Sequence, residues 1–239
     1  MKPFLILEAG RPIDPLRRHG SFGHWIRVAA GLHGREVRHC HIIDGEALPA
    51  RPGDFAGVLI SGSGAMVTEH ADWSERSAEW LRSAAHEGVP LFGICYGHQL
   101  LAHALGGEVG YNPRGREIGT VPVKLHGPAQ ADALFGGLGE AMPAQTTHRQ
   151  SVLKLPPQAE LLASSALDAC QAFRWGESVW GVQFHPEFST ALMRSYILAR
   201  REALVEEGTC HRSLLESVRP APQARRVLDR FVRHARRRA

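Results

Sequence analysis

The sequence has few cysteines and no long apolar segment. Its four cysteines are widely spaced and include no C-x-x-C pair, which argues against both a zinc site and a disulfide framework. No run of 18 apolar residues occurs, so we expect no membrane span. The first residues have the pattern of a short strand rather than of a signal peptide. Together these absences indicate a cytoplasmic protein without a metal site.

Charge is distributed unevenly along the 239 residues. The composition, with 44% hydrophobic and 22% charged residues, is that of a globular protein of one domain, or of one domain with an extension. Residues 1–190 carry 16 Lys and Arg against 19 Asp and Glu, whereas residues 191–239 carry 12 Arg against five acidic residues. The net charge of +4 therefore reflects a basic C-terminal segment and does not indicate a nucleic-acid-binding domain.

The first half of the chain alternates apolar strands with amphipathic helices. The strand patterns lie at 3–8, 36–43, 55–61 and 89–94, and the helical patterns at 21–32, 73–87 and 98–105. This alternation predicts an α/β fold with a twisted, mostly parallel sheet and helices on both faces. Short strand-like segments between 117 and 184 predict an additional antiparallel β region.

The chain becomes helical after Pro186. We expect helices over 189–206 and about 211–237, interrupted at Gly208. The sequence thus divides into a catalytic domain at 1–190 and an Arg-rich helical extension at 191–239. Apolar residues between 218 and 232 recur at helical spacing, which predicts a helix docked on the body or on a second subunit with its arginines in water. Nothing in the sequence gives this extension a part in chemistry.

The segment Gly93-Ile94-Cys95-Tyr96-Gly97 lies between an apolar strand and a helix. It has the G-x-nucleophile-x-G pattern of a nucleophile elbow, in which glycines allow a tight, strained turn. The N-terminal dipole of the following helix favours the thiolate of Cys95. The backbone N–H of Tyr96 points to where an oxyanion would develop. Taken alone, these five residues also fit a buried structural cysteine.

A cysteine nucleophile requires a base, and the base requires an orienting partner. Among 14 histidines, His185 stands out because it ends an apolar strand and precedes Pro186-Glu187. A histidine at a strand end can reach a nucleophile at the same sheet edge, and the carboxylate of Glu187 can hold the imidazole. Taken alone, this segment also fits a surface His-Pro-Glu turn.

The two motifs together resemble the class I (triad-type) glutamine amidotransferases. The matching segments are Gly93-Ile94-Cys95-Tyr96-Gly97-His98-Gln99 and Gly181-Val182-Gln183-Phe184-His185-Pro186-Glu187. Their order and spacing also fit the family, and the resemblance, which spans roughly residues 3–190, is greatest to the glutaminase half of GMP synthase. It implies a flavodoxin-like α/β fold.

The resemblance also implies a role for each matching residue. Cys95 would attack the side-chain amide of glutamine and form a γ-glutamyl thioester. His185 would transfer the protons, and Glu187 would orient His185. Backbone N–H groups of Tyr96 and of the loop containing Gly62 and Ser63 would stabilise the oxyanion.

Three further residues are implied in substrate binding. Gln99 would bind the amino-acid end of the substrate, and the backbone near Gln150 and Ser151 would contact the same end. His148 is a second candidate base, although we expect it to shape the loop because no H-P-E motif follows it. Glu117, in a segment similar to the R-E-x-G element of the family, would contact substrate or form a structural ion pair. The resemblance implies no cofactor.

The sequence departs from the family in two places. The loop that usually reads S-G-G-P is Ser61-Gly62-Ser63-Gly64 here, and serine keeps the backbone donor in place only if the local φ and ψ suit a non-glycine residue. No G-x-x-x-x-G-K-[ST] motif occurs, and the 49 residues after position 190 are too few for a synthase domain. The resemblance is therefore to a stand-alone form.

Three functions are consistent with these observations. The first is release of ammonia from glutamine for an acceptor, which a separate synthase subunit could hold. The second is hydrolysis of γ-glutamyl peptides or related compounds by the same triad. The third is a non-enzymatic scaffold, which the intact set of Cys95, His185 and Glu187 argues against. A homo-oligomer stays open, whereas neither nucleic acid nor a membrane is expected as a partner.

Overall fold

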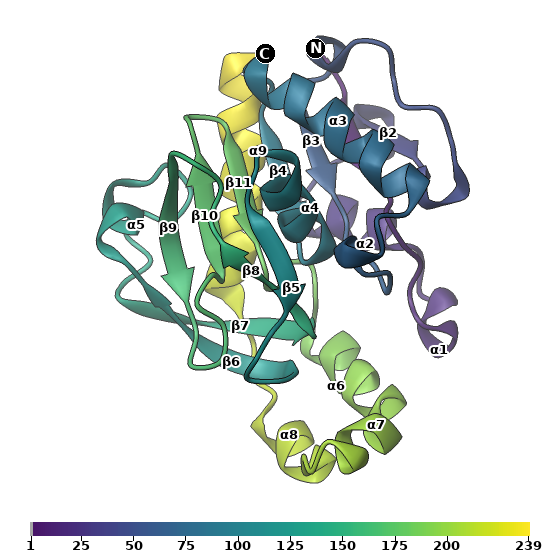
Figure 1. Ribbon diagram of the computed structural model, residues 1–239, viewed down its shortest axis with the longest axis vertical. Coiled ribbons are helices and arrows are strands. Elements are labelled where there is room, and N and C mark those ends of the chain that lie inside the picture. The colour runs from purple at the N-terminus through teal and green to yellow at the C-terminus, as the bar shows by residue number, and fades with distance from the viewer. Residues whose placement is uncertain (1) are drawn as a thin grey trace.

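A nine-stranded sheet forms the centre of the computed structural model, which describes residues 2–239. Its strands are β1 (Phe4–Leu7), β2 (Val37–Cys40), β3 (Gly57–Ile60), β4 (Leu91–Ile94), β6 (Glu117–Leu125), β7 (Ala141–His148), β9 (Ala159–Ser164), β10 (Ala172–Trp175) and β11 (Val179–Val182). They lie in the order β2-β1-β3-β4-β11-β10-β9-β6-β7 (Figure 1).

The sheet changes character at β11. The strands β2, β1, β3, β4 and β11 pair in parallel, whereas β10, β9, β6 and β7 pair antiparallel. The predicted α/β fold is confirmed, but the antiparallel region continues the same sheet and makes it mixed. The reason is local: β10 and β11 form a hairpin through Gly176, so the last strand of the parallel half carries the antiparallel half with it.

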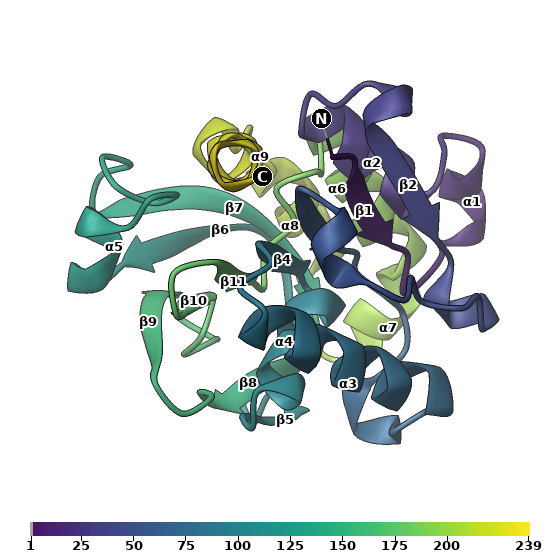
Figure 2. The same cartoon turned by 90° about the horizontal axis from the view of Figure 1, so that it is seen from above.

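Nine α-helices surround the sheet among residues 2–239. They are α1 (Asp14–Arg17), α2 (Phe22–Ala29), α3 (Asp72–His86), α4 (Tyr96–Ala104), α5 (Gly127–Ala131), α6 (Thr190–Ala199), α7 (Arg201–Glu206), α8 (His211–Ser217) and α9 (Pro222–Arg238). Short 3-10 turns lie at Gly34–Glu36, Ile42–Asp44, Pro52–Asp54 and Val67–Glu69. Figure 2 shows α2 and α9 on one face of the central strands and α3 and α4 on the other, as predicted.

The C-terminal helix α9 belongs to the core. Val227, Leu228 and Phe231 are fully buried together with residues of the central strands. The helix approaches β3 so closely that a Cβ on Gly57 would lie 3.0 Å from the Cβ of Ala235. The predicted docking of an apolar helix face on the body is thus confirmed. Apolar burial on this scale makes α9 a main contributor to stability.

The helices α6, α7 and α8 form a separate group at one end of the molecule (Figure 1). Their apolar residues pack with α1, α2 and Phe188 in a third hydrophobic cluster, whose buried members include Tyr196, Ile197 and Leu204. The predicted helix over 189–206 is divided at Arg200, and the predicted helix over 211–237 is divided before Pro222.

A second sheet pairs β5 (Glu108–Tyr111) with β8 (Gln150–Lys154). Strand β8 was predicted from the sequence, but β5 was not, because its residues are exposed or half-buried and show no apolar alternation. The turn between β7 and β8 contains Arg149, so this small sheet fixes the turn that faces the active-site region.

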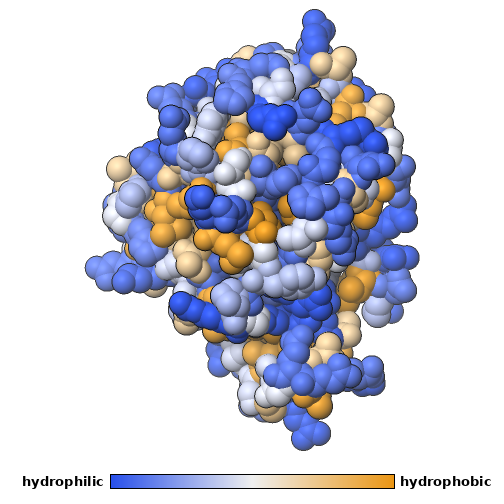
Figure 3. All heavy atoms as spheres, in the orientation of Figure 1, coloured by the Kyte–Doolittle hydropathy of each residue, from blue (hydrophilic) through white to orange (hydrophobic). Residues whose placement is uncertain are grey.

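Hydrophilic residues cover most of the face shown in Figure 3, where apolar residues lie in small separate groups. Exposed large apolar side chains include Leu198 and Val205 of the α6 to α8 group. Among residues 2–239, no helix is both long and apolar enough to cross a membrane.

Candidate active site

The candidate nucleophile Cys95 lies in a strained turn between β4 and α4. Its backbone has φ 52° and ψ −101°, a region that residues with a side chain rarely adopt. A Cβ on Gly93 would lie 2.3 Å from the carbonyl oxygen of Gly97, and a Cβ on Gly97 would lie 2.6 Å from the carbonyl oxygen of Ile60. Only glycine fits at both positions, as expected for a nucleophile elbow.

His185 and Glu187 lie beside Cys95. Strand β11 pairs in parallel with β4, so His185, three residues after β11, reaches the same sheet edge as Cys95. The Nδ1 atom of His185 is 2.8 Å from Oε1 of Glu187, and both residues are buried. The ring of Phe188 stacks on the imidazole at 4.1 Å between centroids. The imidazole is therefore held on one edge by a carboxylate and on one face by an aromatic ring.

The thiol and the imidazole form a charge pair. Burial opposes both charged forms, but Glu187 and Cys95 outweigh it and raise the pKa of His185 to about 10. Burial likewise opposes the thiolate, yet the charge of His185 lowers the pKa of Cys95 below its ordinary value. The Nε2 atom of His185 is buried and makes no hydrogen bond of good geometry to another group. The arrangement favours a thiolate facing an imidazolium, the reactive state of a cysteine nucleophile.

His148 is held in a buried network beneath the site. Its Nδ1 lies 3.0 Å from the carbonyl oxygen of Gln150, and its Nε2 lies 3.1 Å from Oε2 of Glu117. Burial disfavours the imidazolium, but the bond to Glu117 and the charge of Asp168 raise the pKa of His148. The structural ion pair is thus the observed role of Glu117, and His148 is a fixed positive charge that lowers the pKa of Cys95.

The loop after β3 places Gly62 and Ser63 beside the nucleophile. A Cβ on Gly62 would lie 3.1 Å from Cε1 of His185 and 3.7 Å from Cβ of Cys95, so this position faces both groups. Ser63 has no positive φ, which explains why serine fits where the family has glycine. Its hydroxyl accepts a hydrogen bond from the N–H of Ala65 at 3.0 Å and thereby shapes the loop.

Tyr96 and Gln99 occupy the first turn of α4. The hydroxyl of Tyr96 is 2.6 Å from Oγ of Ser74, and this buried contact anchors the start of the helix. Backbone N–H groups in a first turn have no acceptor within the helix, which leaves the N–H of Tyr96 available to a ligand. The side-chain amide of Gln99 donates to the carbonyl oxygen of Gln150 at 2.7 Å and to Oε1 of Gln183 at 2.9 Å.

Gln150 and Ser151 differ in their relation to the site. Gln150 lines the cavity at Cys95, and its side-chain amide donates to Oγ1 of Thr68 at 2.6 Å. Ser151 is buried away from the cavity and donates to Oδ2 of Asp168 at 2.7 Å. The structure therefore brings Gln99 and Gln150 together at the cavity but leaves Ser151 behind its wall.

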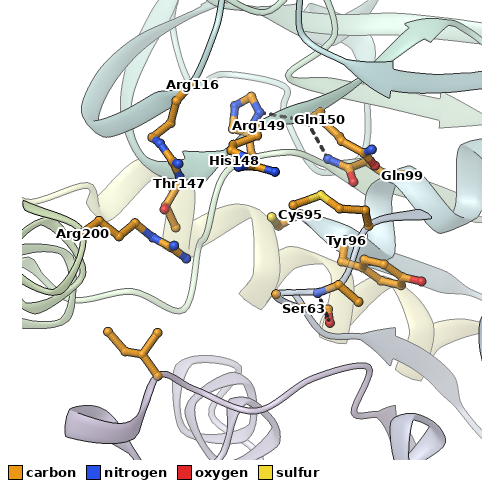
Figure 4. Close-up of a pocket in the computed structure, with 14 residues that line it drawn as sticks. Ser63, Cys95, Tyr96, Gln99, Arg116, Thr147, His148, Arg149, Gln150 and Arg200 are labelled. Carbon is orange, nitrogen blue, oxygen red and sulfur yellow. Dashed lines mark hydrogen bonds between the residues drawn. The ribbon is translucent and has the colours of Figure 1, made fainter. Parts of the chain in front are cut away.

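A cavity of about 370 Å³ opens above Cys95 (Figure 4). Ser63, Tyr96, Gln99 and Gln150 line it, together with His148. His185, Glu187 and Gly62 do not line it, since they lie beneath Cys95. The cavity thus exposes the nucleophile to a ligand and keeps its base and carboxylate away from water.

Known proteins with this architecture fit the same interpretation. The family described as glutamine amidotransferase class-I matches residues 20–203. The chain belongs to the class I glutamine amidotransferases. The family predicted from the two motifs is therefore confirmed.

Two curated relatives of this amidotransferase chain differ in length. A GMP synthase (glutamine-hydrolyzing) of Aeropyrum pernix is 39% identical over 144 residues, which are 60% of this chain and 25% of the relative. Gamma-glutamyl peptidase 3 of Arabidopsis thaliana is 28% identical over 182 residues, which are 72% of each protein. The chain thus spans only about a quarter of the GMP synthase, but most of the peptidase.

A solved structure supports the fold over the whole chain. The glutamine amidotransferase of Methylobacillus flagellatus has a TM-score of 0.79 at 21% identity, and the match covers 100% of this chain and 95% of the other. The match includes the C-terminal helices, so these are part of an architecture known in another amidotransferase.

Three arginines at the cavity were missed as site residues by the sequence analysis. Arg116, Arg149 and Arg200 line the cavity together with Cys95. Arg200 comes from the junction of α6 and α7, in the extension for which we expected no part in the site. The only signal available was the position of Arg116 and Arg149 next to Glu117 and Gln150. Nothing in the sequence around Arg200 distinguishes it from the other arginines of the extension.

Among residues 2–239, one trio of side chains has the spacing of metal ligands. One ligand atom each of His70, Glu75 and His103 lies within 4.8 Å of the others, at the surface beside α3 and α4. The predicted family implies no metal, and the histidines between 19 and 41 that the sequence groups together do not form such a trio in the structure. The contacts of His70 and His103 with Glu75, at 2.9 and 3.1 Å, account for this arrangement without an ion.

Proposed function

We propose that the protein is an enzyme that hydrolyses the γ-glutamyl amide bond, with glutamine as substrate and ammonia as leaving group. The observation that carries this proposal is the charge pair of Cys95 and His185, which opens onto a closed-sided cavity through an elbow of fixed geometry. Family membership supports the same reaction.

In the first half of the reaction, the thiolate of Cys95 attacks the carbonyl carbon of the substrate amide. The carbonyl oxygen becomes an oxyanion, which we place against the backbone N–H groups of Tyr96 and of Gly62 or Ser63. The imidazolium of His185 gives its proton to the amide nitrogen, the C–N bond breaks and ammonia leaves. A γ-glutamyl thioester and a neutral imidazole remain, so atoms and charges balance.

In the second half, water cleaves the thioester. Neutral His185 takes a proton from water while the hydroxide oxygen adds to the acyl carbon. The C–S bond then breaks and glutamate leaves, which restores the thiolate and the imidazolium. Glu187 keeps Nδ1 of His185 bonded through both halves, so that Nε2 always faces the reacting atoms.

Gln99 and Gln150 are proposed to bind the amino-acid end of the glutamyl group. Their mutual hydrogen bond makes one rigid wall of the cavity, which supports this assignment. The proposed role of Ser151 is indirect, because its hydroxyl bonds Asp168 and its backbone continues from Gln150.

An ammonia acceptor would have to be supplied by a separate synthase subunit. The match to only a quarter of a GMP synthase supports this partner, because the remaining length of that relative has no counterpart here. A cytoplasmic location is supported by the four cysteines, all of which are free thiols. A homo-oligomer also remains a proposal.

Hydrolysis of γ-glutamyl peptides or related compounds is the second candidate function. A specific observation favours it: a further cavity of about 610 Å³ adjoins the first and shares Arg116 and Arg149 with it. Binding sites of roughly 300–1,000 Å³ suit ligands larger than a single amino acid. The relative of comparable length, gamma-glutamyl peptidase 3, supports the same reading.

The proposed function is tested by Cys95→Ala in assays of ammonia and glutamate release from glutamine and from γ-glutamyl dipeptides. We expect a loss of at least about 10³-fold with unchanged folding, because the nucleophile is removed. Cys40→Ala is the matched control, since Cys40 is also buried at a strand end but burial raises its pKa to about 11. Full activity of Cys95→Ala would refute nucleophilic catalysis at this site.

A further inference from the structure

Three cationic side chains converge on the cavity from distant parts of the chain. Arg116 precedes β6, Arg149 lies between β7 and β8, and Arg200 lies between α6 and α7. All three line the wall of the cavity that contains Cys95. Burial lowers the pKa of Arg200, and the charges of Arg116 and Arg149 lower it further, so the three guanidinium groups lie within electrostatic range of one another.

Only one of these cations is neutralised by a carboxylate. Arg116 forms two hydrogen bonds of 2.8 Å to Glu207. Arg149 contacts the ring and hydroxyl of Tyr111, and Arg200 lies over the ring of Tyr196 at 5.7 Å. Among residues 2–239, neither Arg149 nor Arg200 has a carboxylate within 4 Å, and Nε of Arg200 is buried without a partner. The cavity thus holds two uncompensated positive charges.

Glutamine does not compensate these charges. Its α-carboxylate is balanced by its own α-ammonium group, so its net charge is zero at neutral pH. A γ-glutamyl amino acid carries a second carboxylate on the leaving group and has a net charge of −1. An arginine with no protein partner binds such a carboxylate with good geometry.

The arginines also lie on the appropriate side of the nucleophile. Figure 4 shows Arg116 and Arg200 on one side of Cys95, and Gln99 and Tyr96 on the opposite side. If the glutamyl group lies against Gln99, the leaving group points toward the arginines. The adjoining cavity of about 610 Å³ begins there, because Arg116 and Arg149 line both spaces.

We propose that Arg149 and Arg200 bind a carboxylate of the leaving group, so that γ-glutamyl amino acids or peptides with a free carboxyl end are better substrates than glutamine. This inference rests on the proposed hydrolysis of γ-glutamyl amides and names the substrate class. The reaction balances as before: the leaving nitrogen receives the proton of His185 and becomes an amino group, and water supplies the new carboxylate oxygen of glutamate.

The test compares three substrates: γ-glutamylalanine, the C-terminal amide of γ-glutamylalanine, and glutamine. For the wild-type enzyme we expect kcat/KM to be roughly 10- to 100-fold higher for γ-glutamylalanine than for its amide, since a charge-assisted hydrogen bond is lost with the carboxylate. Arg200→Gln should remove most of this preference and change kcat/KM for glutamine by less than about threefold.

Two further variants separate charge from folding. Arg200→Lys keeps the cation and should retain part of the preference, whereas loss in both variants with lowered melting temperatures would indicate a structural role only. Arg201→Gln is the matched control, because Arg201 is the next residue, has a side chain 65% exposed and faces Glu202. It should leave all three rates unchanged.

The outcomes for the two proposals are distinct. Equal kcat/KM for the dipeptide and its amide would overturn the carboxylate subsite and leave the proposed function intact. No hydrolysis of any of the three substrates would refute the proposed function. In that case, calorimetric titration of Cys95→Ala with the dipeptide and its amide still tests the subsite, and equal affinity for both would overturn it.

Discussion

The two sides of the cavity around Cys95 are built in different ways. The nucleophile side takes Cys95, Tyr96 and Gln99 from one strand–helix unit, in which each residue is fixed by its neighbours in sequence. The arginine side takes Arg116, Arg149 and Arg200 from three connections that meet only in the folded chain. Chemistry is therefore encoded locally in this protein, and the charge that would select the substrate is assembled by tertiary structure.

The largest effect should come from Glu187→Gln on the nucleophile side. The change removes the charge that raises the pKa of His185 but keeps a similar shape. We expect kcat/KM to fall roughly 10²- to 10⁴-fold, and by the same factor for glutamine and for γ-glutamylalanine. Steady-state assays with both substrates measure this. A fall confined to one substrate would contradict the division between the two sides.

The pH profile of the same variant gives a second readout. In the wild-type enzyme, kcat/KM should fall as the pH rises through about 10, because imidazolium must protonate the leaving nitrogen and His185 loses its proton there. Without the charge of Glu187 the pKa of His185 is lower, so the alkaline limb should move to lower pH. An unmoved limb would show that another group controls it.

Gly93→Ala should have an intermediate effect, on stability as well as activity. Its Cβ would lie 2.3 Å from the carbonyl oxygen of Gly97, and the backbone must shift to relieve this contact. A cost of about 1–3 kcal/mol, typical of overpacking, corresponds to a fall in melting temperature of roughly 5–10 °C. Gly53→Ala is the control, because a Cβ there meets no atom within 4 Å. Similar melting of the two variants would disprove the tight elbow.

The smallest effect should come from Glu207→Gln on the arginine side. The carboxylate of Glu207 is partly exposed, so removing its pairing with Arg116 should change stability by less than about 1 kcal/mol. Arg116 then becomes a third uncompensated cation, and KM for γ-glutamylalanine should fall by a few-fold while that for glutamine stays constant. Initial-rate measurements decide this, and a higher KM for the dipeptide would contradict it.

Much of the fold could be predicted because its signals are local. The apolar strands of the parallel half and the helices α2, α3 and α4 follow from periodicity, and the position of Cys95 follows from the glycines around it. The sequence also indicated β6 to β11, but not that the antiparallel strands continue the parallel sheet. That continuity depends on which edge β10 joins, which a hairpin turn alone does not specify.

The arginine side could not be predicted for a related reason. Arg200 reaches the cavity because the helical segment breaks there, between α6 and α7, without a glycine or proline to mark the break. Its guanidinium is then aimed by Tyr196, which packs on Phe188, which in turn stacks on His185. Each of these contacts joins residues whose proximity no spacing rule anticipates.

The strained backbone of Cys95 has a consequence for how stability and activity are balanced. A φ of 52° with a ψ of −101° disfavours any residue with a Cβ, whatever its side chain does. Among variants without a thiol, Cys95→Gly should therefore be more stable than Cys95→Ala, by on the order of 1 kcal/mol, although glycine normally weakens a helix start relative to none of its better caps and loosens the unfolded chain. The residue that makes the chain reactive is one at which the fold would be more stable without it.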